Sequence, residues 1–295
     1  MPINYKLQKI ENHTSNINSS AIGKFYIIST PIGNIKDITI RGLDILNFVD
    51  KIVCEDTRVT GRLLMHYGIK KPMIVYNDHS SVNERDKIVN YLLNNDNIAF
   101  VSDAGTPLIS DPGYCLVNAV IEAGIDVTSI PGACSVITAL TLAGLPTNSF
   151  TFIGFLPKTK QSRLNELESA KEIKTTLIFF ETAKRLLDAL NDVYAVLGNR
   201  RVAIMRELTK LYEEVRRGYI DEEIKYWQNK ELKGEFVIVL EGAIEKELSE
   251  LEIEDQMKVL LNEMSFKDAV EFADSSLKIK KKKAYEVALR IKKNM

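Results

Sequence analysis

Short apolar runs alternate with longer amphipathic stretches along most of the chain. In the first half, the apolar runs predict strands and the amphipathic stretches predict helices. Strands that are apolar throughout and alternate with helices are typical of a parallel sheet covered on both faces. This half is therefore predicted to be an α/β domain. The predicted strands are 25–28, 52–54, 73–75, 98–101 and 127–130, and the predicted helices are 43–48, 62–67, 82–93 and 114–122.

A second alternation begins after Pro131-Gly132 with a predicted helix over 134–142, ended by Gly144 and followed by a break at Pro146. Strands are then predicted at 150–155, 177–180, 202–205 and 236–240, with helices at 162–170, 183–197 and 221–227. From Glu245 onward the chain is more charged and predicted to be entirely helical. The predicted organisation is a flexible tail (1–22), α/β domains at 23–133 and 134–244, and a helical, basic C-terminal element at 245–295.

Composition narrows the class of protein. The 295 residues suggest about two domains. No apolar run approaches the ~20 residues that cross a bilayer, and the polar first twenty residues lack the apolar stretch of a secretion signal. Cys54, Cys115 and Cys134 lie far apart without a CxxC pair. We therefore expect a cytoplasmic protein with no membrane segment and no metal site.

The charge is uneven although its net value is -1. The stretch 278–295 holds eight basic residues against Glu286 alone, whereas 245–263 is strongly acidic. A basic end is compatible with a surface that faces nucleic acid, although on charge alone a solvated helix end is the simpler interpretation. The segment 265–285 predicts two short helices around Ser275-Ser276, similar to a helix-turn-helix element that leads into a basic helix.

Ligands of open parallel sheets bind outside the carboxyl ends of the strands, where the loops converge. In the first half, small, turn-forming and acidic residues gather in the loops that follow four predicted strands. This concentration predicts a binding cleft at one edge of the sheet. The loops are Ser29–Asn34, Glu55–Arg58, Ser102–Gly113 and Pro131–Ser135.

The ligand class is narrowed by what these loops lack. The chain has no GxxxxGK[ST] motif and no GxGxxG after its first strand, and three of the loops carry no Lys or Arg for a phosphate. Small residues let a ligand approach the backbone closely, and Asp103 can accept hydrogen bonds from hydroxyl or ammonium groups. A nucleoside that carries a positive charge and no phosphate fits better than ATP or NAD. Asp103 could instead close an Asx turn before Gly105.

Six motifs in order carry a resemblance to a known family. The chain resembles the bacterial ribosomal RNA small-subunit methyltransferase I family, of the tetrapyrrole (corrin/porphyrin) methylase superfamily, over roughly residues 23–295. The motifs are TPIGNIKDIT (30–39), EDTR (55–58), SDAGTPLISDPG (102–113), GLPT (144–147), GFLP (154–157) and RELTK (206–210).

The resemblance implies transfer of a methyl group from S-adenosylmethionine to the ribose 2′-OH of a cytidine in 16S rRNA, near the decoding site. It implies two α/β domains with the cofactor in the cleft between them, a 16S rRNA or small-subunit substrate, and a homodimer. Residues carried over as cofactor contacts are Pro31, Gly33, Asp103, Ala104, Gly105, Thr106, Pro131, Gly132, Ser135, Pro146, Thr147 and Glu181.

The chain departs from the family pattern in two places. Phe179–Arg185 reads FFETAKR where FYESPHR is expected, so any role of the histidine is lost or passes to Lys184. Asn77–Glu84 reads NDHSSVNE where the family usually has HEHNE, and no catalytic role is carried over to that loop.

Methyl transfer is an in-line displacement, so the protein mainly aligns the reacting atoms. A general base for the hydroxyl is typically worth ~10²–10⁴-fold. Glu55 and Asp56 are the candidates, although either could cap the next helix. Arg58 could hold the neighbouring phosphate or steady the developing alkoxide. Predicted RNA contacts are Lys36, Arg206, Lys210, Lys280, Lys281, Lys282 and Lys283, for which solvent-exposed surface residues are the simpler alternative.

Two other functions stay open at this point. A relative that methylates a corrinoid or porphyrin precursor would share the fold and the cofactor. A non-catalytic RNA-binding protein could retain the cleft as a vestige. The basic C-terminal element and the motifs at 55–58 and 206–210 match the RNA branch of the superfamily.

Overall fold

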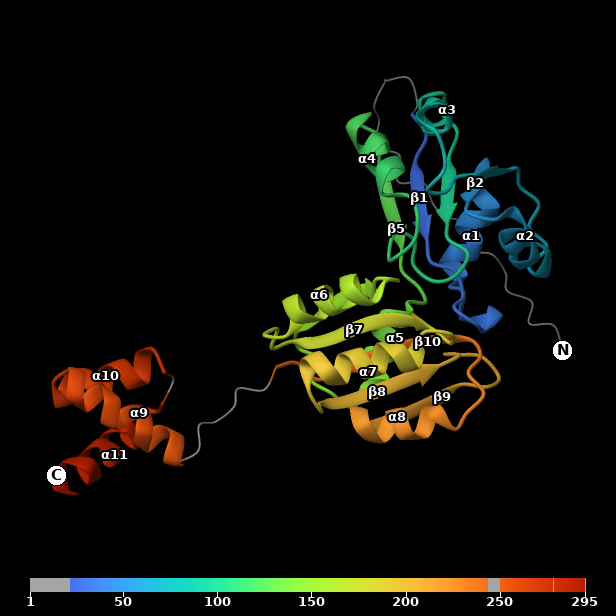
Figure 1. The fold of residues 1–295 in the computed structure, drawn as a ribbon. Helices are drawn as coiled ribbons and strands as arrows, with labels where there is room; N and C mark the ends of the chain where they lie inside the picture. Colours follow the sequence, from blue (N-terminus) through green and yellow to red (C-terminus); the bar gives the residue numbers. More distant parts are fainter. Residues whose placement is uncertain (1–21, 244–249, 278, 295) are drawn as a thin grey trace. The chain divides into compact units, whose positions relative to one another are not determined.

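The structure is a computed structural model that describes residues 22–243, 250–277 and 279–294. Nearly all of the tail predicted at 1–22 therefore lies outside the described residues, as does Lys278 of the basic cluster. The chain divides into two compact units, one ending at Ala243 and one that follows it. Each unit has its own hydrophobic cores and is described by itself (Figure 1). None of the described helices combines the length and the apolarity needed to cross a membrane.

The first half of the larger unit is a five-stranded, all-parallel sheet with strand order β3-β2-β4-β1-β5. The helices cover both of its faces, as the apolar strands predict (Figure 1). Ile45, Leu46 and Leu64 pack on one face, and Ile88, Leu92 and Leu116 pack on the other. The elements are β1 (Phe25–Ile28), α1 (Ile40–Phe48), β2 (Lys51–Cys54), α2 (Thr57–His66), β3 (Met73–Val75), α3 (Val82–Leu93), β4 (Ile98–Val101), α4 (Tyr114–Glu122) and β5 (Val127–Ile130).

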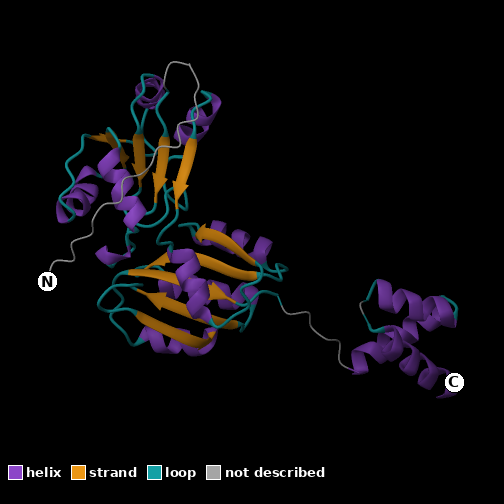
Figure 2. Ribbon diagram, turned by 180° about the vertical axis from the view of Figure 1, so that it is seen from behind, coloured by secondary structure: helices purple, strands orange, loops and turns teal. Residues whose placement is uncertain are grey.

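The second half is a mixed sheet with order β6-β7-β10-β8-β9, in which only β6 and β7 run parallel. α5 packs on one face through Val136 and Leu140, and α6, α7 and α8 cover the other face around Trp227. The elements are α5 (Ser135–Ala143), β6 (Phe150–Phe155), α6 (Lys160–Ala170), β7 (Thr176–Thr182), α7 (Leu186–Leu197), β8 (Arg201–Arg206), β9 (Glu214–Tyr219), α8 (Ile220–Gln228) and β10 (Glu235–Leu240). Figure 2 shows the two sheets as separate groups of strands.

Helix starts differ from the sequence-based predictions where a polar cap precedes an apolar run. α1 begins at Ile40, three residues before the predicted start, because the Thr39 side chain accepts a hydrogen bond from the Gly42 N–H. α2 begins at Thr57 and not at Arg62, because Asp56 caps it. The polar edge strand β9 was not predicted, since its sequence EVRRGY has no apolar run.

The described residues of the smaller unit form three helices, α9 (Glu250–Glu263), α10 (Phe266–Ser275) and α11 (Lys281–Asn294), around a core that includes Met257, Ala273 and Ala288 (Figure 2). The acidic and basic stretches of the sequence meet across these helices. Lys283 pairs with Glu250, and Arg290 lies 2.8 Å from Glu254. Part of the basic charge therefore holds the unit together.

Candidate functional site

Three loops of the parallel sheet are fastened together at its carboxyl edge. Thr30 and Gly105 exchange two backbone hydrogen bonds of 2.8 and 3.0 Å. The Thr106 hydroxyl lies 3.0 Å from the Ser29 hydroxyl and donates to the Ala133 carbonyl at 3.1 Å. The loops that follow β1, β4 and β5 therefore form one rim, as parallel strands predict.

This rim is packed too closely for larger side chains, and part of it is strained. A Cβ at Gly132 would lie 2.8 Å from the Cβ of Ser29. In the loop between β4 and α4, Leu108 and Ser110 adopt left-handed φ angles of 75° and 63°. Such angles cost free energy in non-glycine residues and persist only where the surroundings enforce them, which happens most at functional sites.

A second contact joins this rim to the other half of the unit. The Asn34 N–H donates to the Thr209 hydroxyl at 3.0 Å, and a Cβ at Gly33 would lie 2.5 Å from Cγ of Lys210. The Lys210 ammonium in turn lies 3.0 Å from Glu207 and 3.1 Å from Glu235. Lys210 is thus fixed at the seam between the two sheets.

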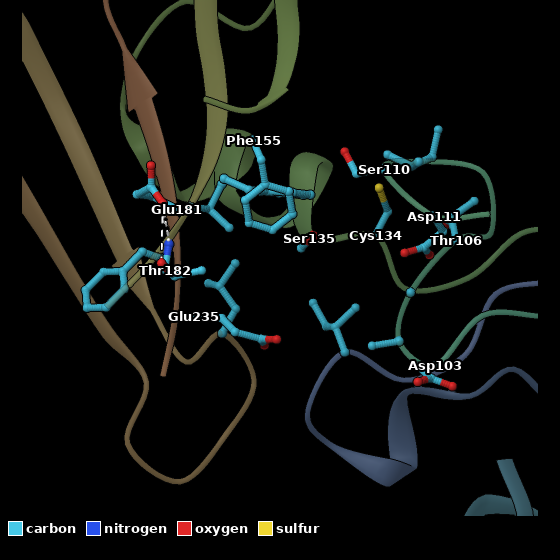
Figure 3. Close-up of a pocket in the computed structure, with 18 of the residues that line it drawn as sticks. Asp103, Thr106, Ser110, Asp111, Cys134, Ser135, Phe155, Glu181, Thr182 and Glu235 are labelled. Carbon is cyan, nitrogen blue, oxygen red and sulfur yellow. Dashed lines mark hydrogen bonds between the residues drawn. The ribbon is translucent and has the colours of Figure 1, made fainter. Parts of the chain in front are cut away.

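A pocket of about 340 Å³ opens at this seam (Figure 3). Its size lies within the ~300–1,000 Å³ range of small-molecule sites. Eight of the residues singled out from the sequence line it: Glu55, Asp103, Ala104, Gly105, Thr106, Ser135, Glu181 and Lys210. Five further lining residues belong to the loops predicted to form the cleft: Ile32, Ile109, Ser110, Asp111 and Cys134. The sequence did not indicate a place in the site for the others: Phe155, Phe180, Thr182, Leu208, Glu235, Phe236 and Val237.

The other predicted cofactor residues are placed differently. Pro31, Gly33, Pro131 and Gly132 belong to the fastened loops but do not line the pocket. Pro146 and Thr147 are not brought to it. The Pro146 carbonyl accepts a hydrogen bond from Thr176, at the start of β7, whereas Glu181 lies near the end of that strand.

Carboxylates dominate the charge of the pocket. Burial, and after it the charges of Asp103 and Asp78, raises the pKa of Asp111 to about 6. Burial, followed by the charges of Asp103 and Asp111, raises the pKa of Glu55. Burial also raises the pKa of Asp103, although the Asp56 N–H donates to it at 3.2 Å. Glu181 and Glu235 add further acidic groups, and Lys210 is the one basic side chain among the described lining residues. Such a site favours a cationic ligand over a phosphate.

Asp56 and Arg58 are committed to each other. Asp56 is the N-cap of α2, accepts a hydrogen bond from the Arg58 N–H at 2.7 Å, and holds the Arg58 guanidinium through both carboxylate oxygens. Hydrogen bonding by Arg58 lowers the pKa of Asp56 to about 2. Neither residue lines the pocket. We therefore correct the choice of Asp56 as a base: its capping role is realised, and a carboxylate held in this way accepts a proton poorly.

Glu181 forms a buried wall of the pocket. Its side chain is fully buried, and Oε1 accepts a hydrogen bond from the Thr182 N–H at 2.8 Å (Figure 3). Oε2 accepts no hydrogen bond and lies 3.1 Å from the Arg185 guanidinium. Burial raises the pKa of this carboxyl. Arg185 also donates to the carbonyls of Leu156 and Pro157 at 2.5 and 3.0 Å, so it fixes the segment that follows β6.

The remaining predicted RNA contacts lie outside the pocket. Arg206 donates to the Lys233 carbonyl at 2.8 Å and lies 3.8 Å from Glu214, and Lys36 is exposed in the short 3₁₀ helix Ile35–Asp37. Lys280, Lys281, Lys282 and Lys283 all belong to the smaller unit.

The sequence of residues 24–223 matches the family of Tetrapyrrole (Corrin/Porphyrin) Methylases. Proteins named Ribosomal RNA small subunit methyltransferase I match over most of their length. The protein from Escherichia coli O157:H7 is 42% identical over 95% of this chain and 99% of its own. The protein from Rickettsia prowazekii is 42% identical over 89% and 95%, and that from Halalkalibacterium halodurans is 47% identical over 76% and 78%. The chain belongs to the ribosomal RNA small subunit methyltransferase I family of tetrapyrrole methylases.

Solved structures share the fold at low sequence identity. Diphthine synthase aligns with a TM-score of 0.61 at 15% identity and covers 79% of this chain and 94% of its own. The cobalamin biosynthetic enzyme cobalt precorrin-4 methyltransferase aligns with a TM-score of 0.55 at 18% identity, over 74% and 94%. The two-domain α/β fold expected from the family resemblance is confirmed.

One of the two departures from the family pattern has a structural role in this member. In the segment 77–84, Ser81 caps α3, and the Glu84 side chain accepts a hydrogen bond from the Ser81 N–H at 2.7 Å. This reciprocal capping stabilises the start of the helix. Asp78 of the same segment adds negative charge near Glu55 and Asp111.

Proposed function

We propose that this chain transfers a methyl group from S-adenosylmethionine to the ribose 2′-OH of a cytidine in the rRNA of the small ribosomal subunit. The observation that carries the proposal is the acidic pocket at the seam of the two sheets. The names of relatives that this chain matches over most of their length support rRNA as the substrate. An rRNA substrate implies a cytoplasmic site of action, and the family resemblance favours a homodimer, which sedimentation analysis would detect.

The residues present fit S-adenosylmethionine. Its sulfonium and ammonium are both positive, which suits the carboxylates of Asp103, Asp111 and Glu181. Oε2 of Glu181 is buried and accepts no hydrogen bond, although it lies 3.1 Å from the Arg185 guanidinium. α5 begins at Ser135 without a side-chain cap, so N–H groups are available there for a carboxylate. Ala104 and Gly105 leave room for close approach of a nucleoside. When bound, the cofactor supplies an electrophilic methyl group.

The chain's own groups would then orient the ribose and accept its proton. Glu55 borders the pocket, and its raised pKa makes it a better proton acceptor than an ordinary glutamate. Arg58 has an exposed side chain beside it and could contact a phosphate of the RNA. Lys210 is the basic side chain of the pocket lining, and a phosphate contact there would compete with its ion pairs to Glu207 and Glu235.

A methylation assay with nucleoside analysis tests this function. The purified protein would be incubated with methyl-labelled S-adenosylmethionine and small ribosomal subunits, purified 16S rRNA, or a porphyrin precursor. We expect label in the RNA, recovered as 2′-O-methylcytidine. Label in the porphyrin alone would favour the corrinoid or porphyrin alternative. Binding of RNA without any calorimetric binding of S-adenosylmethionine would favour a non-catalytic RNA-binding protein.

Cofactor binding is expected to tighten as the pH rises from 5 to 7. Asp111 has a folded pKa of about 6 against an ordinary value of 3.8, so it is largely protonated at pH 5 and ionised at pH 7. A cation favours the ionised form, so binding at pH 6 should release protons. Calorimetry at pH 6 in two buffers of different ionisation enthalpy measures that release.

Asp111→Asn is the matched variant for this measurement, because it keeps the shape of the side chain and removes the titration. It should abolish most of the proton release. The same linkage predicts that the variant is the more stable protein above pH 6 without ligand, since the folded state no longer holds a buried charge. Equal proton release by both proteins would show that another group titrates.

The smaller unit is proposed to bind RNA, and deleting residues 244–295 should weaken RNA affinity while sparing cofactor binding. A cut at 244 removes the unit with its whole core, whereas a cut at 264 would leave the apolar face of α9 exposed. RNA affinity that is unchanged by the deletion would identify the basic helix as a solvated end.

Replacing individual lysines of the smaller unit tests its RNA binding more specifically than the deletion does. Within the described residues neither Lys280 nor Lys282 forms an ion pair, whereas Lys283 pairs with Glu250. Replacing Lys280 and Lys282 by Ala should make the negative slope of log affinity against log salt shallower by about 1.4, at about 0.7 per phosphate contact on single strands. Lys283→Ala is the control, because its charge is already neutralised.

A further inference from the structure

Phe155 is a large aromatic side chain that a strand irregularity turns toward the pocket. In the pairing of β6 with β7, Phe152 lies opposite Ile178 and Phe155 lies opposite Phe180, with a register shift between Phe152 and Gly154. Residues three apart on a regular strand point to opposite faces. The extra residue of the bulge places Phe152 and Phe155 on the same face, and bulges beside active sites re-aim side chains in this way.

The contacts of Phe180 confirm that arrangement. Its ring centroid lies 5.0 Å from that of Phe152 and 5.4 Å from that of Phe155, each with an interplanar angle of 65°. Gly154, at the bulge, has a φ of +81°, and a Cβ there would lie 3.3 Å from the Ser110 hydroxyl. The backbone at the bulge therefore lies close to the Ser110 side chain, across the pocket from β7.

The segment that follows Phe155 is also fixed. Arg185 donates to the carbonyls of Leu156 and Pro157, and Arg163 donates to the Lys158 carbonyl at 3.5 Å. The backbone after Phe155 is thus anchored and its ring packs on Phe180, and yet 52% of the residue is exposed. Figure 3 shows it projecting between the Glu181 side of the pocket and the side that carries Ser110 and Asp111. Its exposed surface borders the opening, whereas Gly105 and Glu181 form the buried wall.

We infer that the exposed surface of Phe155 is a stacking surface for the nucleobase of the nucleotide that is methylated. The inference rests on the proposed function and adds the group that receives the base. A ribose can reach the pocket only if its nucleotide leaves the neighbouring stack, and proteins compensate unstacked RNA bases by stacking them on aromatic rings. A half-exposed phenyl ring that lines the pocket and packs on Phe180 meets that requirement.

The test compares three variants. Phe155→Leu keeps an apolar side chain but removes the aromatic face, Phe155→Tyr restores that face, and Phe150→Ala removes a 39%-exposed ring at the other end of the same strand. For Phe155→Leu we expect a roughly 5- to 100-fold higher KM for small ribosomal subunits, which corresponds to the loss of one base–aromatic stack. The Kd for S-adenosylmethionine should stay unchanged, and Phe155→Tyr and Phe150→Ala should resemble the unsubstituted protein.

A spectroscopic measurement separates stacking from general binding. An RNA oligonucleotide that carries the fluorescent base pyrrolocytosine should be quenched by the unsubstituted protein and by Phe155→Tyr, but not by Phe155→Leu. If Phe155→Leu instead weakens binding of S-adenosylmethionine, the ring packs on the cofactor and the inference is wrong. An unchanged KM in Phe155→Leu would also overturn it. Absence of rRNA methylation by the unsubstituted protein would instead contradict the proposed function itself.

Discussion

Replacing Glu55 by Gln is expected to lower the turnover number by roughly 10²–10⁴-fold, the usual contribution of a positioned general base. Glu55 follows β2 directly and borders the pocket, where burial and the neighbouring carboxylates raise its pKa. The amide keeps the size of the side chain but accepts a proton far less readily. The Kd for S-adenosylmethionine, measured by calorimetry, should change little.

The pH dependence provides an independent check of this role. Only the ionised carboxylate accepts a proton, so the turnover number should fall as the pH drops through the raised pKa of Glu55. That acid limb should disappear from the residual activity of Glu55→Gln. Glu122→Gln removes one negative charge from the exposed end of α4 and serves as the control. Wild-type turnover in Glu55→Gln would leave Asp103 or Asp111 as the acceptor.

The parallel sheet and its rim could be predicted from sequence because apolar strands and polar loops differ sharply in composition. Every strand of the first half was found, and so was the edge at which Asp103 and Glu55 meet. The edge strand β9 was missed for the corresponding reason, since a strand with one solvated face and two arginines carries no apolar run.

The orientation of two pocket residues, one in each half of the larger unit, could not be derived from the sequence. Phe155 and Asp111 lie within motifs that the sequence displays, but their orientation depends on a bulge in β6 and on left-handed residues in the loop before α4. A period-2 pattern does not reveal a bulge, which changes the direction of a side chain without changing the composition. Asp56 shows the converse case. From the sequence, a carboxylate just before a helix could act either as a base or as the N-cap. The structure distinguishes the two roles, because the Arg58 guanidinium occupies both carboxylate oxygens of Asp56.

Asp192→Ala is expected to destabilise the protein by about 3–5 kcal/mol, because it leaves the charge of Arg163 buried without its partner. The two side chains are 6% and 9% exposed, and their closest atoms lie 2.6 Å apart. At about 2–4 °C per kcal/mol, the expected fall in Tm is roughly 6–20 °C. Thermal unfolding followed by circular dichroism measures it.

Glu168→Ala is the matched control for this ion pair. It breaks the contact between Glu168 on α6 and Lys171 at the C-cap of that helix, whose side chains are 61% and 44% exposed, and should cost only about 0–1 kcal/mol. Arg163 also holds the Lys158 carbonyl, close to the segment that Arg185 fixes behind Phe155. Its charge acts on Glu181 as well, so an unpaired Arg163 is expected to move toward that carboxylate and weaken cofactor binding. If Asp192→Ala lowers the free energy of unfolding no more than Glu168→Ala does, the expected loss of about 3–5 kcal/mol is wrong. Because a buried guanidinium without any partner costs much more than that, Glu181 would then have replaced Asp192 as the partner of Arg163.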